Sequence, residues 1–180
     1  WGIPIHRGLG KTGVVGIVHG RDGGACGRAI GLRADMDALP MQEFNTFDHA
    51  SQHPGKMHAC GHDGHTAMLL AAAQHLAQHG GFSGTLNLIF QPAEEGGGGA
   101  LRMMDDGLFE QFPCDAVFAM HNNPGTPQGD LVLREGPTMA SSDYATITVT
   151  GAGGHGAMPH LATDPLVAAA SIVMALQTVV

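Results

Sequence analysis

Residues 57–65 read MHACGHDGH and place three histidines, one cysteine and one aspartate within nine positions. Thiolate sulfur and imidazole nitrogen, together with a carboxylate, bind zinc or a neighbouring transition metal better than they bind calcium or magnesium. The Cys-x-His spacing is too short for a structural zinc finger, and no CxxC pair follows it. The cluster therefore favours a catalytic metal site over a structural one.

Further side chains able to bind a metal follow three strand-like segments. Asp35 and Asp37 come after AIGLRA, Glu94 and Glu95 after TLNLIFQP, and His121 after DAVFAM. Taken singly, each has an ordinary explanation as a turn aspartate, an acid at a helix start or a strand-end histidine bonded to a carbonyl. A lone cysteine is equally well explained as a small buried hydrophobic residue. Together they predict one site, because a metal would satisfy all of these polar groups at once.

The sequence around these residues alternates between strand-like and helix-like patterns. Strands are expected at residues 13–19, 28–34, 85–91 and 115–121, and helices at 63–79 and 98–106. The apolar face of the longer helix is expected to contain Met68, Leu69, Ala72, Ala73 and Leu76. This alternation predicts an α/β fold with a mostly parallel sheet covered by helices on both faces. Because ligands bind beyond the carboxyl ends of such strands, the four segments are expected to meet at one edge.

Composition narrows the possible partners and the location. The 180 residues are 43% hydrophobic and 13% charged, with a formal net charge of −8 and no run of Lys or Arg. A small-molecule partner is therefore expected, and not a nucleic acid, whose phosphates need clustered positive charge. Cys26, Cys60 and Cys114 have no CxxC spacing, so a disulfide framework is not expected and the cytoplasm is the predicted location. The apolar residues 165–180 are too few to span a membrane and are expected to form a buried helix.

Residues 8–13, GLGKTG, match the GxGxxG pattern of dinucleotide-binding loops. Such a loop must follow a strand and open a helix. Here the strand-like run VVGIVHG follows instead. The motif is therefore expected to form a turn before a strand, and no nucleotide cofactor is predicted.

Five segments, in order along the chain, resemble the motifs of a known family. They are LRADMDALPMQE at 32–43, MHACGHDGHTAMLL at 57–70, IFQPAEEGGGGA at 89–100, MHN at 120–122 and GGHGAMPH at 153–160. The chain resembles the M20-type metallopeptidases, in the amidohydrolase branch that holds hippurate hydrolases and N-acyl-amino-acid amidohydrolases. The resemblance covers essentially the whole chain.

The resemblance implies a site with two divalent metal ions, which could be zinc, manganese, nickel or cobalt. Its metal ligands would be Cys60, His62, Glu95 and His121, and its general base would be Glu94. The implied reaction is metal-dependent hydrolysis of the amide bond of N-acyl amino acids, in which a metal-activated water loses its proton to Glu94. A non-catalytic metal-binding or substrate-binding module and an inactive truncated fragment remain as alternatives.

One motif departs from the wider superfamily. Much of the superfamily has His-x-Asp after this strand, whereas this chain has Asp35-Met36-Asp37, so one histidine ligand is absent there. Cys60 would compensate for that loss, as it does in the amidohydrolase branch. Asp37 is expected to orient a metal ligand, because metal-bound imidazoles usually donate their other N–H to a carboxylate or a carbonyl. His65 is kept as a reserve ligand.

The pattern changes near residue 138. Residues 1–138 are expected to form an incomplete catalytic metal-binding domain, and residues 139–180 the start of a smaller α+β lid and dimerisation domain. Within the second part, residues 141–151 alternate polar and apolar side chains like a strand. A helix is expected to follow, with Asp164 as its N-cap and Pro165 at its first position.

The second part contributes one more candidate site residue. His155 resembles the family's histidine that reaches the active site, often that of the partner subunit, to stabilise an oxyanion or hold a substrate carboxylate. A plain turn histidine between glycines is the alternative. Both chain ends are expected to be cuts in a longer protein, with the family's last histidine ligand beyond Val180. The complete protein is expected to be a homodimer or higher oligomer formed through the lid domain.

Overall fold

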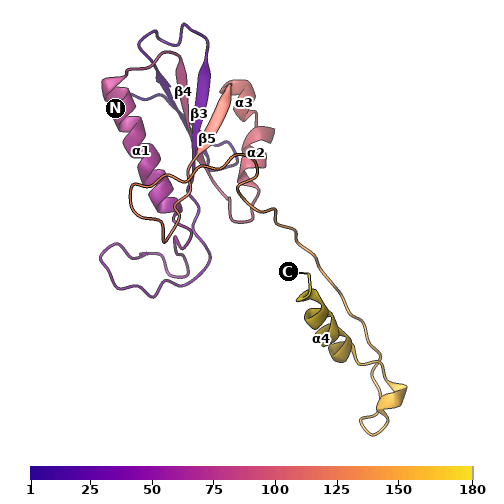
Figure 1. The fold of residues 1–180 in the computed structure, drawn as a ribbon. Helices are drawn as coiled ribbons and strands as arrows, with labels where there is room; N and C mark the ends of the chain where they lie inside the picture. Colours follow the sequence, from indigo (N-terminus) through magenta and orange to yellow (C-terminus); the bar gives the residue numbers. More distant parts are fainter. Residues whose placement is uncertain (180) are drawn as a thin grey trace. The chain divides into compact units, whose positions relative to one another are not determined.

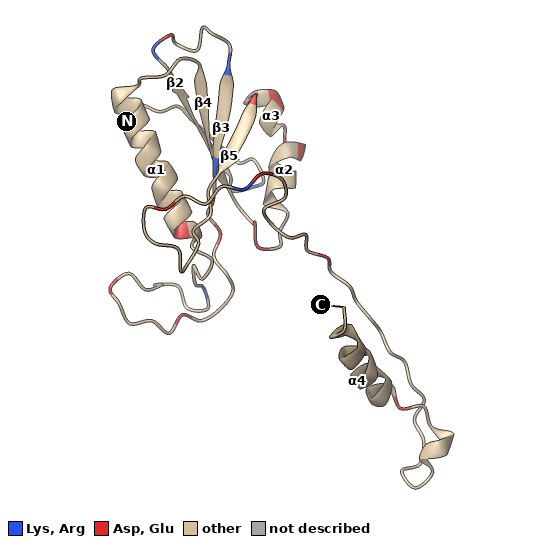
Figure 2. Ribbon diagram, in the orientation of Figure 1, with Lys and Arg blue, Asp and Glu red and all other residues tan. Residues whose placement is uncertain are grey.

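The computed structural model describes residues 1–179 and divides into two compact units, Trp1–Gln128 and Gly129–Val180. The sequence placed the change of domain later, at 138/139. Figure 1 shows the course of the chain, and Figure 2 shows Lys and Arg at scattered single positions along it. The two units are described separately below.

The first unit is built on a mixed sheet of five strands. They are β1 (Ile5–Arg7), β2 (Val14–His19), β3 (Ala29–Asp35), β4 (Thr85–Gln91) and β5 (Ala116–Ala119). The order across the sheet is β1-β2-β4-β3-β5. β3 pairs in parallel with both β4 and β5, whereas β2 pairs antiparallel with β1 and β4. The α/β class and the four predicted strands are confirmed, but only the β4-β3-β5 half of the sheet is parallel.

Helices cover both faces of this sheet, as predicted. α1 (His62–His79) lies on one face, and α2 (Gly99–Asp105) and α3 (Leu108–Gln111) lie on the other (Figure 1). The central strand β4 supplies side chains to both cores, since successive residues of a strand point to opposite faces. Leu88 belongs to one buried cluster with Leu69 of α1, and Ile89 to another with Met103 of α2.

Glycines bound α1 at both ends. Gly61 precedes the helix in the left-handed region (φ 86°), and Gly80 follows it, also with positive φ (60°). The predicted helix is confirmed, but one residue of its apolar face is not. Met68 is 42% exposed, and the buried face is instead formed by His62, His65, Leu69 and Ala73. The two histidines bring polar atoms of the helix into the interior.

The GxGxxG stretch forms the turn between β1 and β2. Its backbone closes on itself, since Gly8 N donates to Gly13 O (3.0 Å) and Gly13 N to Leu9 O (2.8 Å). A strand follows the turn and pairs back on β1. The sequence expectation of a turn before a strand is confirmed.

The second unit contains a short 3₁₀ helix, η1 (Pro159–Leu161), and α4 (Pro165–Leu176). Asp164 caps α4 as predicted, because its Oδ1 accepts a hydrogen bond from Leu166 N (2.8 Å). The strand expected at 141–151 is not formed, since in residues 129–179 the only β-bridge joins Ala152 to Thr163. A strand needs a neighbour to pair its backbone groups.

The expectation that residues 165–180 form a buried helix is wrong for the part that the structure describes. None of the residues of α4 is buried, because the other described residues of its own unit do not cover its apolar side chains. None of the described helices combines the length and the apolar character needed to cross a membrane.

Candidate metal centre

Four segments of the first unit meet at one end of the sheet. They are the carboxyl ends of β3 and β4, the start of α1 and the residues that follow β5. Asp37 after β3 accepts a hydrogen bond from Glu95 N after β4 (3.0 Å) and lies 3.3 Å from Nδ1 of His62 in α1. The parallel strands β3, β4 and β5 place their carboxyl ends together, which is why residues far apart in sequence converge here.

His62 is the centre of the cluster. Its Nδ1 lies 3.0 Å from the carbonyl oxygen of Asp37, and both this oxygen and the nearby carboxylate can only accept, so Nδ1 carries the proton. The lone pair of the neutral ring is therefore on Nε2. Nε2 is buried and has no hydrogen-bond partner among the described residues. A buried nitrogen without a hydrogen-bond partner lowers the free energy of unfolding by about 1–3 kcal/mol, and a bound metal ion would remove that penalty.

Three carboxylates surround the same nitrogen. Oxygens of Asp35, Glu95 and Glu94 lie 3.7, 3.8 and 3.9 Å from Nε2 of His62. These separations are too long for hydrogen bonds. Two ligands of one tetrahedral zinc ion are roughly 3.3–3.8 Å apart, given bond lengths of about 2.0–2.3 Å. The three separations lie at or just above the upper end of this range, close to the spacing of side chains that share a cation.

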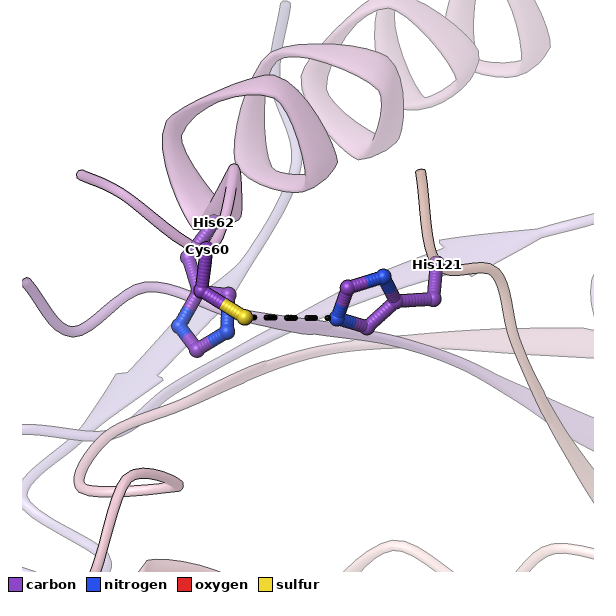
Figure 3. Close-up of side chains that lie close together, drawn as sticks. All are labelled: Cys60, His62 and His121. Carbon is purple, nitrogen blue, oxygen red and sulfur yellow. Dashed lines mark hydrogen bonds between the residues drawn. The ribbon is translucent and has the colours of Figure 1, made fainter. Parts of the chain in front are cut away.

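A thiol and a second imidazole complete the cluster. Cys60 Sγ lies 3.5 Å from His121 Nε2, with His62 beside them (Figure 3). His121 donates from Nδ1 to the carbonyl oxygen of Asn122 (2.7 Å), so its Nε2 also carries the lone pair that faces the cluster. Ligand atoms fall into overlapping groups that share His62, among them Cys60–His62–His121 and His62–Glu94–Glu95. Because Nε2 of His62 can bind only one cation, a second cation would have to be held by the other members of these groups.

The electrostatics of Cys60 also fit a cation. Burial raises the pKa of its thiol, and the hydrogen bond to Glu95 and the negative charges of Glu95, Glu94 and Asp35 raise it further. A thiol binds a metal as the thiolate, and the positive charge of the metal is what stabilises that form. The acidic surroundings are thus consistent with a site built to hold positive charge.

Asp37 stays charged and joins two of the candidate ligands. Burial raises the pKa of its carboxyl, but hydrogen bonds from the backbone N–H groups of Glu95, Glu94 and Asp37 itself, with the nearby His62, bring the pKa below its usual value. One oxygen faces His62 and the other holds the backbone of Glu95. The structure thus places Asp37 where it can orient a ligand.

A strained turn presents the two glutamates. Ala93 adopts a left-handed conformation (φ 51°), which few residues other than glycine adopt. A Cβ on Gly99 would meet the Pro92 carbonyl oxygen at 1.6 Å, so only glycine lets the chain turn back there. Glu94 is 44% exposed at its side chain and Glu95 26%. Glu94 is therefore the more accessible of the two carboxylates.

His65, kept as a reserve ligand, belongs with Asp35 and His62 to a further group that could hold a cation, but its ring nitrogens already have protein partners. Its Nδ1 lies 2.6 Å from Asp35 Oδ1, and its Nε2 accepts from the backbone N–H of Asn122 (3.0 Å). Both ring nitrogens are thus engaged. Burial raises the pKa of Asp35, but its hydrogen bond with His65 and the positive charge of Arg33 lower it below its usual value.

One participant was missed by reasoning from the sequence, and another was expected at the site without a defined role. Asp35, predicted among the metal-binding side chains that follow a strand, is 2% exposed and binds Arg33 (2.8 Å). Asn122 contacts His65 and had no assigned role. Its only signal in the sequence is its position directly after His121. His155 lies in the other unit, within a turn where its Nδ1 accepts from Ala157 N (3.1 Å).

Comparisons with known proteins place this geometry in a family. The model of peptidase family M20/M25/M40 matches residues 31–178. The chain is 51% identical over 180 residues to a hippurate hydrolase of Campylobacter jejuni, covering 100% of this chain and 46% of that protein. It is 44% identical over 180 residues to an N-acetyl-L-cysteine deacetylase of Bacillus subtilis, covering 99% of this chain and 42% of that protein.

A solved structure agrees with these matches. It is a dinuclear metal binding peptidase of the M20 family from Bacillus subtilis, with a TM-score of 0.68 and 42% sequence identity. The similarity covers 75% of this chain and 37% of that one. The chain spans less than half the length of these relatives. With the matched family model and the identities, the cluster at the sheet edge leads to one conclusion: the chain belongs to peptidase family M20/M25/M40.

Proposed function

We propose that this chain carries the metal centre and the general base of a metal-dependent amidohydrolase that cleaves the amide bond of N-acyl amino acids. The observation that carries the proposal is the buried, unpartnered Nε2 of His62, which faces a thiol, a second imidazole and carboxylates. Cys60, His62, Glu95 and His121 would hold two divalent ions, drawn from zinc, manganese, nickel and cobalt.

The names of the relatives support the choice of substrate class. A hippurate hydrolase and an N-acetyl-L-cysteine deacetylase both act, by name, on an amino acid whose nitrogen bears an acyl group. These names belong to proteins of which this chain covers less than half. The shared chemistry, an amide between an acyl group and an amino acid, is what we transfer to the complete protein.

The residues divide the work of hydrolysis by their exposure and contacts. Divalent ions, when bound, polarise the amide carbonyl and make a water molecule more acidic. Glu94 takes the proton of the attacking water, because its carboxylate is the more exposed of the pair, and then passes that proton to the departing amine. Glu95, which is less exposed and whose backbone is held by Asp37, acts as a ligand instead.

Two further residues have proposed roles in this function. Asp37 accepts from Nδ1 of His62 and so keeps Nε2 free for a metal. His155 would stabilise the oxyanion or hold the substrate carboxylate, within a lid and dimerisation domain that begins near residue 138. The proposed partner is therefore a small molecule, together with a second copy of the complete protein.

The test is metal analysis of the complete purified protein followed by an amide-hydrolysis assay with a small panel of N-acyl amino acids. Activity should disappear on chelation and return when zinc, manganese, nickel or cobalt is added back. Metal without hydrolysis of any member of the panel would favour a non-catalytic binding module. Absence of both would contradict the proposed metal centre itself.

A further inference from the structure

We propose that His65 and Asn122 form a positioning pair, which sets the distance between the two halves of the metal centre. One half is Cys60 and His62 at the start of α1, and the other is His121 after β5. The inference rests on the proposed function, because it assigns to the pair a task at that same centre. Neither residue needs to touch a metal or a substrate for this task.

The first observation is the hydrogen bonding of His65, which is 3% exposed. Its Nε2 accepts from the backbone N–H of Asn122 (3.0 Å), so its proton is on Nδ1. Nδ1 donates to the Asp35 carboxylate over 2.6 Å, a short bond to a charged acceptor. The end of the Asn122 side-chain amide lies 2.8 Å from Nε2 of the same ring, and it bonds to this acceptor when the amide nitrogen occupies that position. His65 therefore ties the residues after β5 to the end of β3.

The second observation is that Asn122 touches both halves of the centre. Its carbonyl oxygen accepts from Nδ1 of His121 (2.7 Å), which fixes the proton and the orientation of that ring. Its side-chain amide packs against Gly61, where an added Cβ would meet Oδ1 at 2.6 Å. Gly61 stands directly between Cys60 and His62. A shift of Asn122 would therefore move the ligands of one half relative to the other.

The third observation is that the far end of this chain of contacts is anchored. Asp35, 2% exposed, is also bound by Nη1 of Arg33 at 2.8 Å. Arg33 in turn donates from Nε to Oε1 of Gln91 in β4 (2.8 Å). His65 thus transmits the position of two central strands to Asn122. Metal–ligand distances in proteins lie within about 0.2 Å of standard values, so a fixed reference of this kind matters for affinity.

The test compares metal binding by the complete protein and its variants His65→Ala and Asn122→Ala. Each metal-free protein is titrated calorimetrically with zinc and manganese, and the absorption of its cobalt form reports contact between Cys60 and the metal. Both variants should bind about 10–100-fold more weakly, with the number of ions per chain unchanged. The cobalt–thiolate absorption should shift, which a purely structural loss of stability would not produce. Thr66→Val is the matched control, since it removes a bond from α1 to the Asp35 carbonyl without touching Asn122.

The outcomes separate the possibilities. Wild-type affinity in Asn122→Ala would overturn the proposal, and so would the loss of one ion per chain in His65→Ala, which would make His65 a ligand. If His65→Ala does not fold, Asn122→Ala decides alone, because it removes the side-chain contacts with Gly61 and His65 while the backbone bonds to His65 and His121 support the fold. A wild-type protein that binds no metal overturns the proposed function along with this inference. A wild-type protein that binds metal but hydrolyses no amide overturns the activity only.

Discussion

Replacing Gly61 by alanine tests how tightly the start of α1 is fitted to the segment after β5. Gly61 has a φ of 86°, and a Cβ there would lie 2.6–2.7 Å from three atoms of the Asn122 side chain. Gly64, three residues later and inside α1, has no atom of the described residues within 4 Å of the equivalent position. The same chemical change at these two sites should therefore have effects of opposite sign.

The magnitudes follow from these two environments. A left-handed alanine costs about 1–2 kcal/mol, and forcing a side chain into filled space adds roughly 1–3 kcal/mol. Gly61→Ala should therefore lower the free energy of unfolding by about 2–5 kcal/mol. Gly64→Ala should raise it by about 0.5–1 kcal/mol, because alanine restricts the unfolded chain and favours the helix.

The assay is thermal and denaturant unfolding of the metal-free protein, followed by metal titration. Each kcal/mol corresponds to about 2–4 °C in Tm for a chain of this size. Removal of the Asn122 side chain should relieve the overlap, so in an Asn122→Ala background Gly61→Ala should retain only the left-handed cost of about 1–2 kcal/mol. An equal loss of stability with and without the Asn122 side chain would refute the close contact. An unchanged Tm in Gly61→Ala would refute the backbone argument as well.

Three other perturbations test separate parts of the structure. Glu94→Gln should lower kcat by at least about 10²-fold, or roughly 2.7 kcal/mol in the activation barrier, with metal content unchanged. Glu95→Gln should instead lower the metal content. Wild-type activity in Glu94→Gln would contradict its assignment as the general base. A thiol reagent should label Cys60 more slowly when metal is bound, with the exposed Cys26 as the internal reference, and equal rates would contradict Cys60 as a ligand. Backbone N–H groups of Gly84 and Cys26 lower the pKa of Asp22 from 3.8 to about 2. The contribution of Asp22 to the free energy of unfolding is therefore present above pH 3.8 and lost as the pH falls toward 2. Denaturant unfolding measured across this pH range should show a steeper loss of stability in the wild type than in Asp22→Asn.

The sequence predicted those features that are local or that arise from strand ends. The α1 helix was predictable because Leu69 and Ala73 recur at helical spacing and glycines close both ends. The strand direction was not predictable, since the alternating side chains of β2 read alike whether it runs with or against β4. The cap of α4 was predictable because the capping side chain, Asp164, directly precedes a proline that can only begin a helix, and its carboxylate accepts a hydrogen bond from Leu166 N.

At the candidate site, too, the sequence predicted what depends on local position and did not predict contacts between distant residues. The gathering of Asp37, His62 and Glu95 followed from their positions after strands and before a helix. The engagement of His65 could not be foreseen, because its partners Asp35 and Asn122 are 30 and 57 residues away and nothing local selects them. A histidine on a helix face near other ligands looks the same in sequence whether its nitrogens are free or bonded.

The position of β4 in the sheet has a consequence for how the protein folds during synthesis. β2 and β3 follow one another along the chain but do not pair, because β4 inserts between them with one antiparallel and one parallel neighbour. Until Gln91 has left the ribosome, the inner edges of both earlier strands have no partner, and the non-local pairing that joins them is slow. Glu94 and Glu95 emerge directly after that strand. Strands β1 to β4 and the two glutamates of the centre are therefore brought together in one step, whereas β5 and His121 join later. The nascent chain is most prone to aggregation just before β4 pairs.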